Sequence, residues 1–145
     1  MTWLIDVTDR RFKIPVNAAV IDHIGQTNPF AHSDLGEKLI GLGRALPGAG
    51  LYCPNFKNCA YVLLHDADNR IFAFAGGMRD LSFRLPPVLH GEVLAEGHGR
   101  RSRIGGEWFD FAAFSAASTT PAGEALLASY CAAAKRHVVT LSPTA

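Results

Sequence analysis

Short runs of alternating or continuous apolar residues in the middle of the chain constrain its fold more than any other feature. Three such runs, at 61–65, 70–75 and 80–85, are separated by the turn-forming residues 66–69 and 76–77. The runs are rich in β-branched and aromatic side chains, which fit strands better than helices. Because short strands joined by tight turns pair most simply as hairpins, the centre of the chain predicts an antiparallel meander.

The third run indicates which side chains such a sheet buries. Leu81, Phe83 and Leu85 point to one face of a strand, whereas Ser82 and Arg84 point to the other. We therefore expect one face to carry the core and the other to face solvent. A layer of helices is needed to cover the apolar face.

A second extended region follows later in the chain. Residues 101–104 and 107–114 flank Gly105-Gly106, and a glycine pair accepts the positive φ of a tight turn. The two runs predict a further hairpin.

The first firm helix follows residue 33 and is marked by apolar side chains that recur on one helical face: Leu35, Leu39, Leu42 and Leu46. Asp34 followed by Glu37 has the spacing of a capping box at its start. Pro47-Gly48 ends it.

Two more helices are expected nearer the C-terminus. Residues 88–97 predict a short helix with Gly97 as its C-cap. Thr120 and Pro121 are suited to the first positions of a last helix, which ends near His137.

These elements predict an α+β fold, with an antiparallel sheet of four or more strands covered on one face by helices. At 145 residues, the chain has the length of one domain, 1–145. Within it, 33–138 form the core, and 1–32 are an N-terminal extension. In the extension we expect short strands at 2–7 and 11–14, followed by one or two helical turns.

Charge and cysteine content narrow the class of protein. A net charge of +1 gives no overall field that would draw the chain to nucleic acid or to acidic membranes. An odd number of cysteines, three, without an N-terminal apolar leader favours a reducing compartment, so we expect a cytoplasmic protein. No apolar run approaches the ~20 residues that cross a bilayer, and no membrane association is expected.

Several short segments resemble the MmcQ/YjbR-like family of small α+β proteins across residues 33–138. They are Leu46-Pro47-Gly48, Arg70-Ile71-Phe72-Ala73-Phe74, Gly106-Glu107-Trp108 and Leu126-Leu127-Ala128-Ser129-Tyr130. The resemblance implies an α+β sandwich and, by analogy, DNA binding, but no catalytic residues. Residues 77–99 also look like the small domain called luciferase-like, a name that does not imply light emission.

The candidate binding residues are basic. Arg100, Arg101 and Arg103 lie close together next to His98, with Arg79 and Arg84 expected nearby. Arginine forks match phosphate oxygens, so this set predicts a site for a phosphate or another anion. The alternative is a solvated loop whose arginines pair with the nearby acidic residues Glu92, Glu96 and Glu107.

No metal or cofactor is predicted. Cys53, Cys59 and His65 have the right donor atoms for zinc, but their spacing is not that of paired zinc ligands. Cys131 lies on the apolar stripe of the last helix, which is typical of a small buried side chain. The glycine pairs lack the third glycine of a nucleotide-binding fingerprint.

The favoured function is a non-enzymatic binding or adaptor domain, whose partner is a protein or a small anionic ligand rather than nucleic acid. One alternative is a small enzyme that brings His98 and Glu107 together through the turn at Gly105-Gly106. Another is self-association into a homodimer through aromatic side chains of the strand at 108–114.

Overall fold

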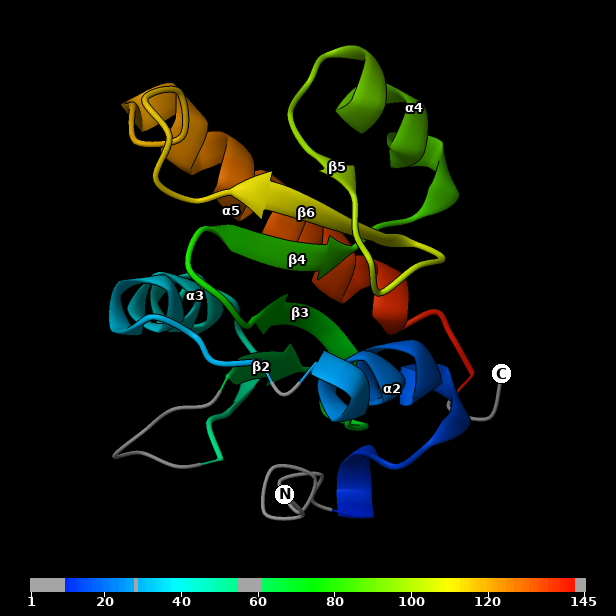
Figure 1. The fold of residues 1–145 in the computed structure, drawn as a ribbon. Helices are drawn as coiled ribbons and strands as arrows, with labels where there is room; N and C mark the ends of the chain where they lie inside the picture. The colour runs from blue at the N-terminus through cyan, green and yellow to red at the C-terminus, as the bar shows by residue number, and fades with distance from the viewer. Residues whose placement is uncertain (1–9, 28, 55–60, 143–145) are drawn as a thin grey trace.

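The computed structural model describes residues 10–27, 29–54 and 61–142, and its centre is a six-stranded antiparallel sheet in the order β1-β2-β3-β4-β6-β5 (Figure 1). The strands are β1 (Gly50–Tyr52), β2 (Val62–His65), β3 (Ile71–Ala75), β4 (Asp80–Arg84), β5 (Arg100–Arg101) and β6 (Trp108–Ala112). The helices are η1 (Arg10–Phe12), η2 (Pro15–Asn17), α2 (Ala18–Thr27), α3 (Ser33–Arg44), α4 (Pro87–Ala95) and α5 (Pro121–Val138). The α+β class and the antiparallel sheet predicted from sequence are confirmed.

The central meander forms where the apolar runs predicted it. The later hairpin also forms, but the strand expected at 101–104 is wrong: β5 is Arg100–Arg101, and the chain turns over 102–107 through hydrogen bonds from the Gly105 amide to the Ser102 carbonyl and from the Trp108 amide to the Gly105 carbonyl. Strands β2, β3 and β4 pair in sequence order, and β5 pairs with β6. The neighbour of β4, however, is β6 and not the next strand in sequence, because the chain runs from β4 through α4 to the outer strand β5 and then turns back into β6. Strand β1 at the opposite edge had no signal in the sequence.

A β-bulge between β2 and β3 decides which side chains face which layer. Leu64 pairs with Ala73, but His65 pairs with Ile71, so the register shifts at Phe72. An extra residue in one strand breaks the simple alternation of faces. As a result Phe72 and Ala73 both join the larger core, while Ile71 joins the smaller one on the other face.

The caps of the two longer core helices differ in how well the sequence predicted them. At α5, the Thr120 side chain accepts a hydrogen bond from the Gly123 amide, as expected. At α3, the predicted capping box is wrong: the N-cap is His32, whose Nδ1 lies 3.1 Å from the Asp34 amide nitrogen. An imidazole nitrogen supplies the acceptor that is usually a hydroxyl or carboxylate oxygen.

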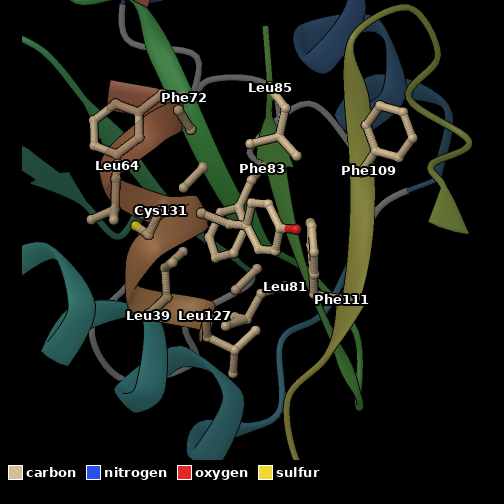
Figure 2. Packing of buried hydrophobic residues seen from close by; sticks show 14 of the residues in the cluster. Leu39, Leu64, Phe72, Leu81, Phe83, Leu85, Phe109, Phe111, Leu127 and Cys131 are labelled. Carbon is tan, nitrogen blue, oxygen red and sulfur yellow. The ribbon is translucent and has the colours of Figure 1, made fainter. Parts of the chain in front are cut away.

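The larger core lies between the sheet and the two helices α3 and α5 (Figure 2). Phe83 from β4 and Phe111 from β6 are fully enclosed there, with ring centres 5.3 Å apart. Cys131 is buried among them, and burial raises the pKa of its thiol to about 12. Its role is therefore that of a small apolar side chain, as its place on the helical stripe indicated.

The N-terminal extension packs on the second face of the sheet, which is only partly open to solvent. Phe12, Val20 and Ile24 form a smaller core with Tyr61, Leu63, Ile71, Phe74, Ile104 and Trp108. Figure 1 shows α2 on the side of the sheet opposite α5. Helices therefore cover one face as expected, and a short helical layer also covers part of the other.

The details predicted for the extension are partly wrong. Residues 10–12 form a 3-10 helix where a strand was expected at 11–14, because Phe12 turns inward to pack edge-on against Tyr52, with ring centres 5.0 Å apart. The helix predicted near residues 16–24 is present as η2 and α2. The strand expected at 2–7 lies outside the described residues.

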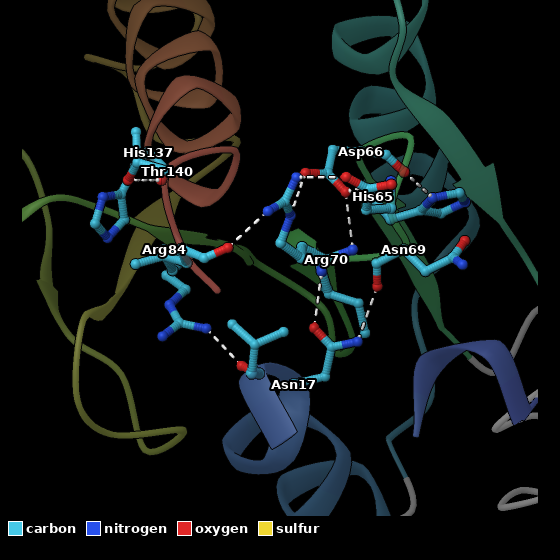
Figure 3. A network of polar contacts seen from close by, with 12 residues as sticks. Asn17, His65, Asp66, Asn69, Arg70, Arg84, His137 and Thr140 are labelled. Carbon is cyan, nitrogen blue, oxygen red and sulfur yellow. Dashed lines mark hydrogen bonds and ion pairs between the residues drawn. The ribbon is translucent and has the colours of Figure 1, made fainter. Parts of the chain in front are cut away.

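One buried asparagine holds this extension to the sheet (Figure 3). The Asn17 side chain donates to the carbonyls of Phe12 and Asn69, at 3.0 and 2.9 Å, and accepts from the Ile71 amide at 2.9 Å. The side chain is only 1% exposed. Buried polar groups of this kind need all their partners, so Asn17 fixes the first turns of the extension to the start of β3 and the residue before it.

Arg84 makes a second link between the extension and the sheet. Its Nη1 donates to the Val16 carbonyl at 2.6 Å, and its Nε donates to Glu107 Oε1 at 2.9 Å. His137 Nε2 lies 2.9 Å from the same carboxylate oxygen. Burial alone would raise the pKa of Glu107, but the hydrogen bonds from His137 and Arg84 lower it overall.

The sheet order also bears on self-association. β6 lies inside the sheet between β4 and β5, and Trp108, Phe109 and Phe111 are buried. Phe114, just after β6, is exposed as expected, but the edge-to-edge route to a dimer is wrong, because β6 is paired with a strand on each side. A homodimer by another surface stays a prediction.

Within the described ranges, no helix is both long and apolar enough to cross a membrane.

We predict that Asn17→Ala lowers the free energy of unfolding by about 2–3 kcal/mol, because it leaves buried backbone groups of Phe12, Asn69 and Ile71 without their partner. Urea denaturation followed by circular dichroism measures the change. Gln26→Ala, on the exposed side of α2, is the control and should shift stability by less than about 0.5 kcal/mol. Equal stability of the two variants would contradict the role given to Asn17.

Candidate functional site

The part of the second face that the extension leaves uncovered is hollowed into a pocket of about 530 Å³ over β4, β6 and β5. We call it the arginine pocket. Its lining comes from α2, from the end of β3 and the turn before β4, from the three strands and from the residues after β5: His23, Phe74, Gly76, Gly77, Met78, Arg79, Asp80, Ser82, Arg100, Arg101, Ser102, Arg103 and Asp110.

Strand register builds the floor of this pocket. Asp110 of β6 lies opposite Ser82 of β4 on one side and opposite Arg100 of β5 on the other. The three side chains therefore form a row across three strands on one face of the sheet. Ser82 Oγ donates to Asp110 Oδ1 at 2.6 Å, and the Arg100 guanidinium donates to Asp80 Oδ2. Each polar group of the row is thus held in a defined orientation.

Arg79 and Arg103 stand at the rim of the pocket, and both are exposed. Arg79 ends the turn between β3 and β4, which is tied to the start of α3 by a 2.7 Å hydrogen bond from the His32 amide to the Gly77 carbonyl. Arg103 follows β5 in the turn that leads to β6. No ion pair of either guanidinium is found within the described part of the chain.

The six candidate residues are only partly brought together. Arg79, Arg100, Arg101 and Arg103 all line the arginine pocket, as the sequence grouping predicted. The guanidinium of Arg101, however, lies over the ring of Phe109 at 5.3 Å, on the side of the larger core, because successive residues of β5 face opposite ways. Arg101 therefore lines the pocket mainly with its backbone, while its charge lies on the opposite face of the sheet.

Arg84 and His98 lie elsewhere. Arg84 borders a separate hollow next to η2 and is engaged by Glu107 and Val16. His98 hydrogen bonds to Tyr130 and lines a third hollow at the far end of β6. The site that would pair His98 with Glu107 is wrong, because the two residues belong to opposite ends of β6 and Glu107 is held by Arg84 and His137.

The alternative of a solvated loop is correct in exposure, because Arg100, Arg101 and Arg103 are all exposed. Its pairing is wrong, because no ion pair found within the described residues joins these arginines to Glu92, Glu96 or Glu107, and Glu107 pairs with Arg84 of β4. Arg100 pairs instead with Asp80, the first residue of β4. This aspartate orients Arg100 along the floor of the pocket, so the ion pair contributes to the shape of the site.

Two contributors to the pocket had no functional signal in the sequence. Phe74 forms an apolar part of the lining, and the His23 ring stands edge-on to it, with ring centres 5.8 Å apart. Burial and the nearby Arg103 lower the pKa of His23, although Asp110 opposes them. His23 is therefore neutral near pH 7, and its ring adds no positive charge to the pocket. Only the docking of the extension brings it there.

The electrostatics of the pocket favour an anion. Three guanidiniums, those of Arg79, Arg100 and Arg103, and two aspartates line it, and at the rim Arg79 and Arg103 are not neutralised by a carboxylate within the described residues. Guanidinium groups at a partly enclosed wall bind carboxylates and phosphates with charge-assisted hydrogen bonds. The lining therefore supplies guanidinium donors, and the one hydroxyl on its floor, Ser82, donates to the Asp110 carboxylate.

The zinc hypothesis for Cys53, Cys59 and His65 does not match the structure. Cys53 is in a disulfide, so it has no thiolate to offer a metal. His65 Nδ1 is engaged by the Asp66 carbonyl at 2.8 Å. Cys59 lies outside the described residues. Across the described ranges no three histidine, cysteine, aspartate or glutamate side chains form a group suited to a metal ion.

Comparison of the chain with protein-family models, with curated proteins and with solved structures found no match. The resemblance to the MmcQ/YjbR-like family and to the luciferase-like domain therefore stays a prediction. The case for a function rests on the geometry of the site alone.

We predict that the two charged neighbours of His23 move its pKa in opposite directions. Arg103→Gln removes a positive charge that disfavours the imidazolium, so the pKa of His23 should rise towards its ordinary value. Asp110→Asn removes a negative charge that favours it, so the pKa should fall further. Proton NMR titration of the histidine ring resonances measures both. If both variants shifted the pKa of His23 in the same direction, the opposite effects assigned to Arg103 and Asp110 would be contradicted.

Proposed function

We propose that the protein is a non-enzymatic binding domain and that the arginine pocket takes a small anionic ligand. The observation that supports this most is the pair of unneutralised guanidiniums, Arg79 and Arg103, which stand at the rim of a hollow whose floor already holds a third, Arg100. An anion that enters the pocket gains these donors without breaking an ion pair of the described residues.

The shape of the pocket suits a small ligand better than a duplex. At about 530 Å³, it lies in the range of small-molecule sites. Its positive side chains sit around one hollow next to Asp80 and Asp110, and the whole chain carries a net charge of only +1. Duplex DNA needs several phosphate contacts spread over a surface, and neighbouring carboxylates repel that backbone.

The proposal also covers a role as an adaptor and the location of the protein. A protein partner that presents a carboxylate or phosphate to the pocket would make the domain an adaptor. A cytoplasmic location follows only from the cysteine count, and the disulfide of Cys53 argues against it because thiols stay reduced in the cytosol.

We predict that inorganic pyrophosphate binds the folded protein and that Arg79→Gln or Arg103→Gln weakens this binding at least about tenfold, the loss expected for a charge-assisted hydrogen bond. Isothermal titration calorimetry at two salt concentrations measures the affinity. The control is Arg136→Gln, an exposed arginine in the last turn of α5 and outside the pocket, which should leave the affinity unchanged.

Three results would count against this function. The first is no heat of binding at low salt, and the second is an equal loss in the Arg136→Gln control, which would indicate a diffuse charge effect. The third is tighter binding of a short DNA duplex than of pyrophosphate at physiological salt, with a steep salt dependence. That result would favour the nucleic-acid alternative.

A further inference from the structure

The third hollow, at the end of β6 where His98 lies, shares no lining residue with the arginine pocket and has a different chemistry. We call it the His98 pocket. It encloses about 260 Å³ between the residues after α4, the end of β6 and the first turns of α5. Phe111, Leu126 and Leu127 give it apolar walls, and Glu96, His98, Ser115 and Ser118 are its polar lining residues.

The backbone that carries His98 is fixed by the end of α4. The His98 amide donates to the Val93 carbonyl and the Gly97 amide to the Leu94 carbonyl, which is the Schellman pattern of helix termination. Gly97 has φ of +68°, a value that favours glycine. The left-handed conformation of Gly97 confirms the predicted glycine cap. The cap also fixes the backbone of His98 relative to Glu92, which lies in the last turn of α4.

A chain of two hydrogen bonds then orients the imidazole. Tyr130 Oη donates to Glu92 Oε2 at 2.7 Å, and His98 Nδ1 lies 2.9 Å from the same hydroxyl. Burial and the bond to Glu92 raise the pKa of Tyr130, so the hydroxyl keeps its one proton. Because that proton is directed to the carboxylate, the hydroxyl can only accept from His98. The proton of the neutral ring is therefore on Nδ1.

This assignment leaves Nε2 of neutral His98 with a lone pair that has no hydrogen-bond partner among the described residues. Among the other lining side chains that the structure describes, none offers a free donor. The two serine hydroxyls satisfy each other: Ser118 donates to the Ala112 carbonyl, and Ser115 to Ser118. The remaining polar lining side chain, Glu96, is an exposed carboxylate at the mouth. Acceptors next to apolar walls repel anions and match a molecule that brings its own O–H or N–H donor.

We propose that the His98 pocket is a second binding site, which takes a small apolar molecule with one hydroxyl or amine donor, and that Nε2 of His98 accepts the hydrogen bond from it. Glu92 and Tyr130 are positioning residues, because they act on the ligand only through the orientation and tautomer of His98. His98 thus belongs to this site and not to the anion site for which its neighbouring arginines are suited.

The tautomer is tested first, by long-range ¹H–¹⁵N correlation of the histidine rings at about pH 8.5, roughly two units above the ordinary imidazole pKa. We expect the Nδ1–H form for His98, which is the less common form of a solvent-exposed neutral histidine. Tyr130→Phe should return His98 towards the Nε2–H form. The control is Tyr61→Phe, which removes a buried hydroxyl that has no hydrogen-bond partner within the described residues and should leave His98 unchanged. An Nε2–H signal in the unmodified protein overturns the proposal.

Binding is tested with three probes of similar size: phenol, toluene and benzoate. We expect phenol to bind about three- to tenfold more tightly than toluene, the gain from one hydrogen bond, and benzoate to bind this pocket more weakly than either. Amide shifts on titration should centre on Gly97, His98, Gly123 and Leu127. In Tyr130→Phe the preference for phenol over toluene should fall towards one. Equal affinity of phenol and toluene in the unmodified protein, or phenol shifts centred on the arginine pocket, would refute the site.

Discussion

The pairing of β4 with β6 is the constraint on which the described sites depend. These strands are not neighbours in sequence, because α4 and β5 lie between them. Their register places Ser82 opposite Asp110 and Arg84 opposite Trp108. A shift by one residue would turn every side chain of one strand to the opposite face. The floor of the arginine pocket, the link from Arg84 to Glu107 and the place of Phe111 beside the His98 pocket all follow from this single alignment.

Most of the elements in the second half of the chain could be predicted, because local patterns mark them. The alternation of Leu81, Ser82 and Phe83 predicted a strand with two unlike faces, and Thr120 with Pro121 marked the start of α5. The bulge at Phe72 could not be predicted in this way. It depends on how two strands align with each other, which no single run of residues records.

The candidate site shows the same division between local and distant information. Arg100, Arg101 and Arg103 are neighbours in sequence, so their grouping was visible, and Arg79 joined them as predicted. His23 and Asp110 could not be found, because they reach the pocket through the docking of α2 and the register of β6. His98 was grouped with the arginines because it is close to them in sequence. In the structure, the glycine turn after α4 directs its side chain towards Tyr130 instead. The type of a residue and its neighbours in sequence can mark it as a candidate site residue. They do not show which distant residues it contacts in the folded protein.

The outer strand β5 has a consequence for how the protein avoids unwanted assembly. A free sheet edge presents unpaired amides and carbonyls that can recruit a strand from another molecule. β5 offers only two residues, Arg100 and Arg101, and both are exposed. Charge repulsion between two such edges and the shortness of the ladder both discourage continuous intermolecular sheets. The arginine that lies on the floor of the pocket and the one beside it thus also make this edge a poor template for a further strand.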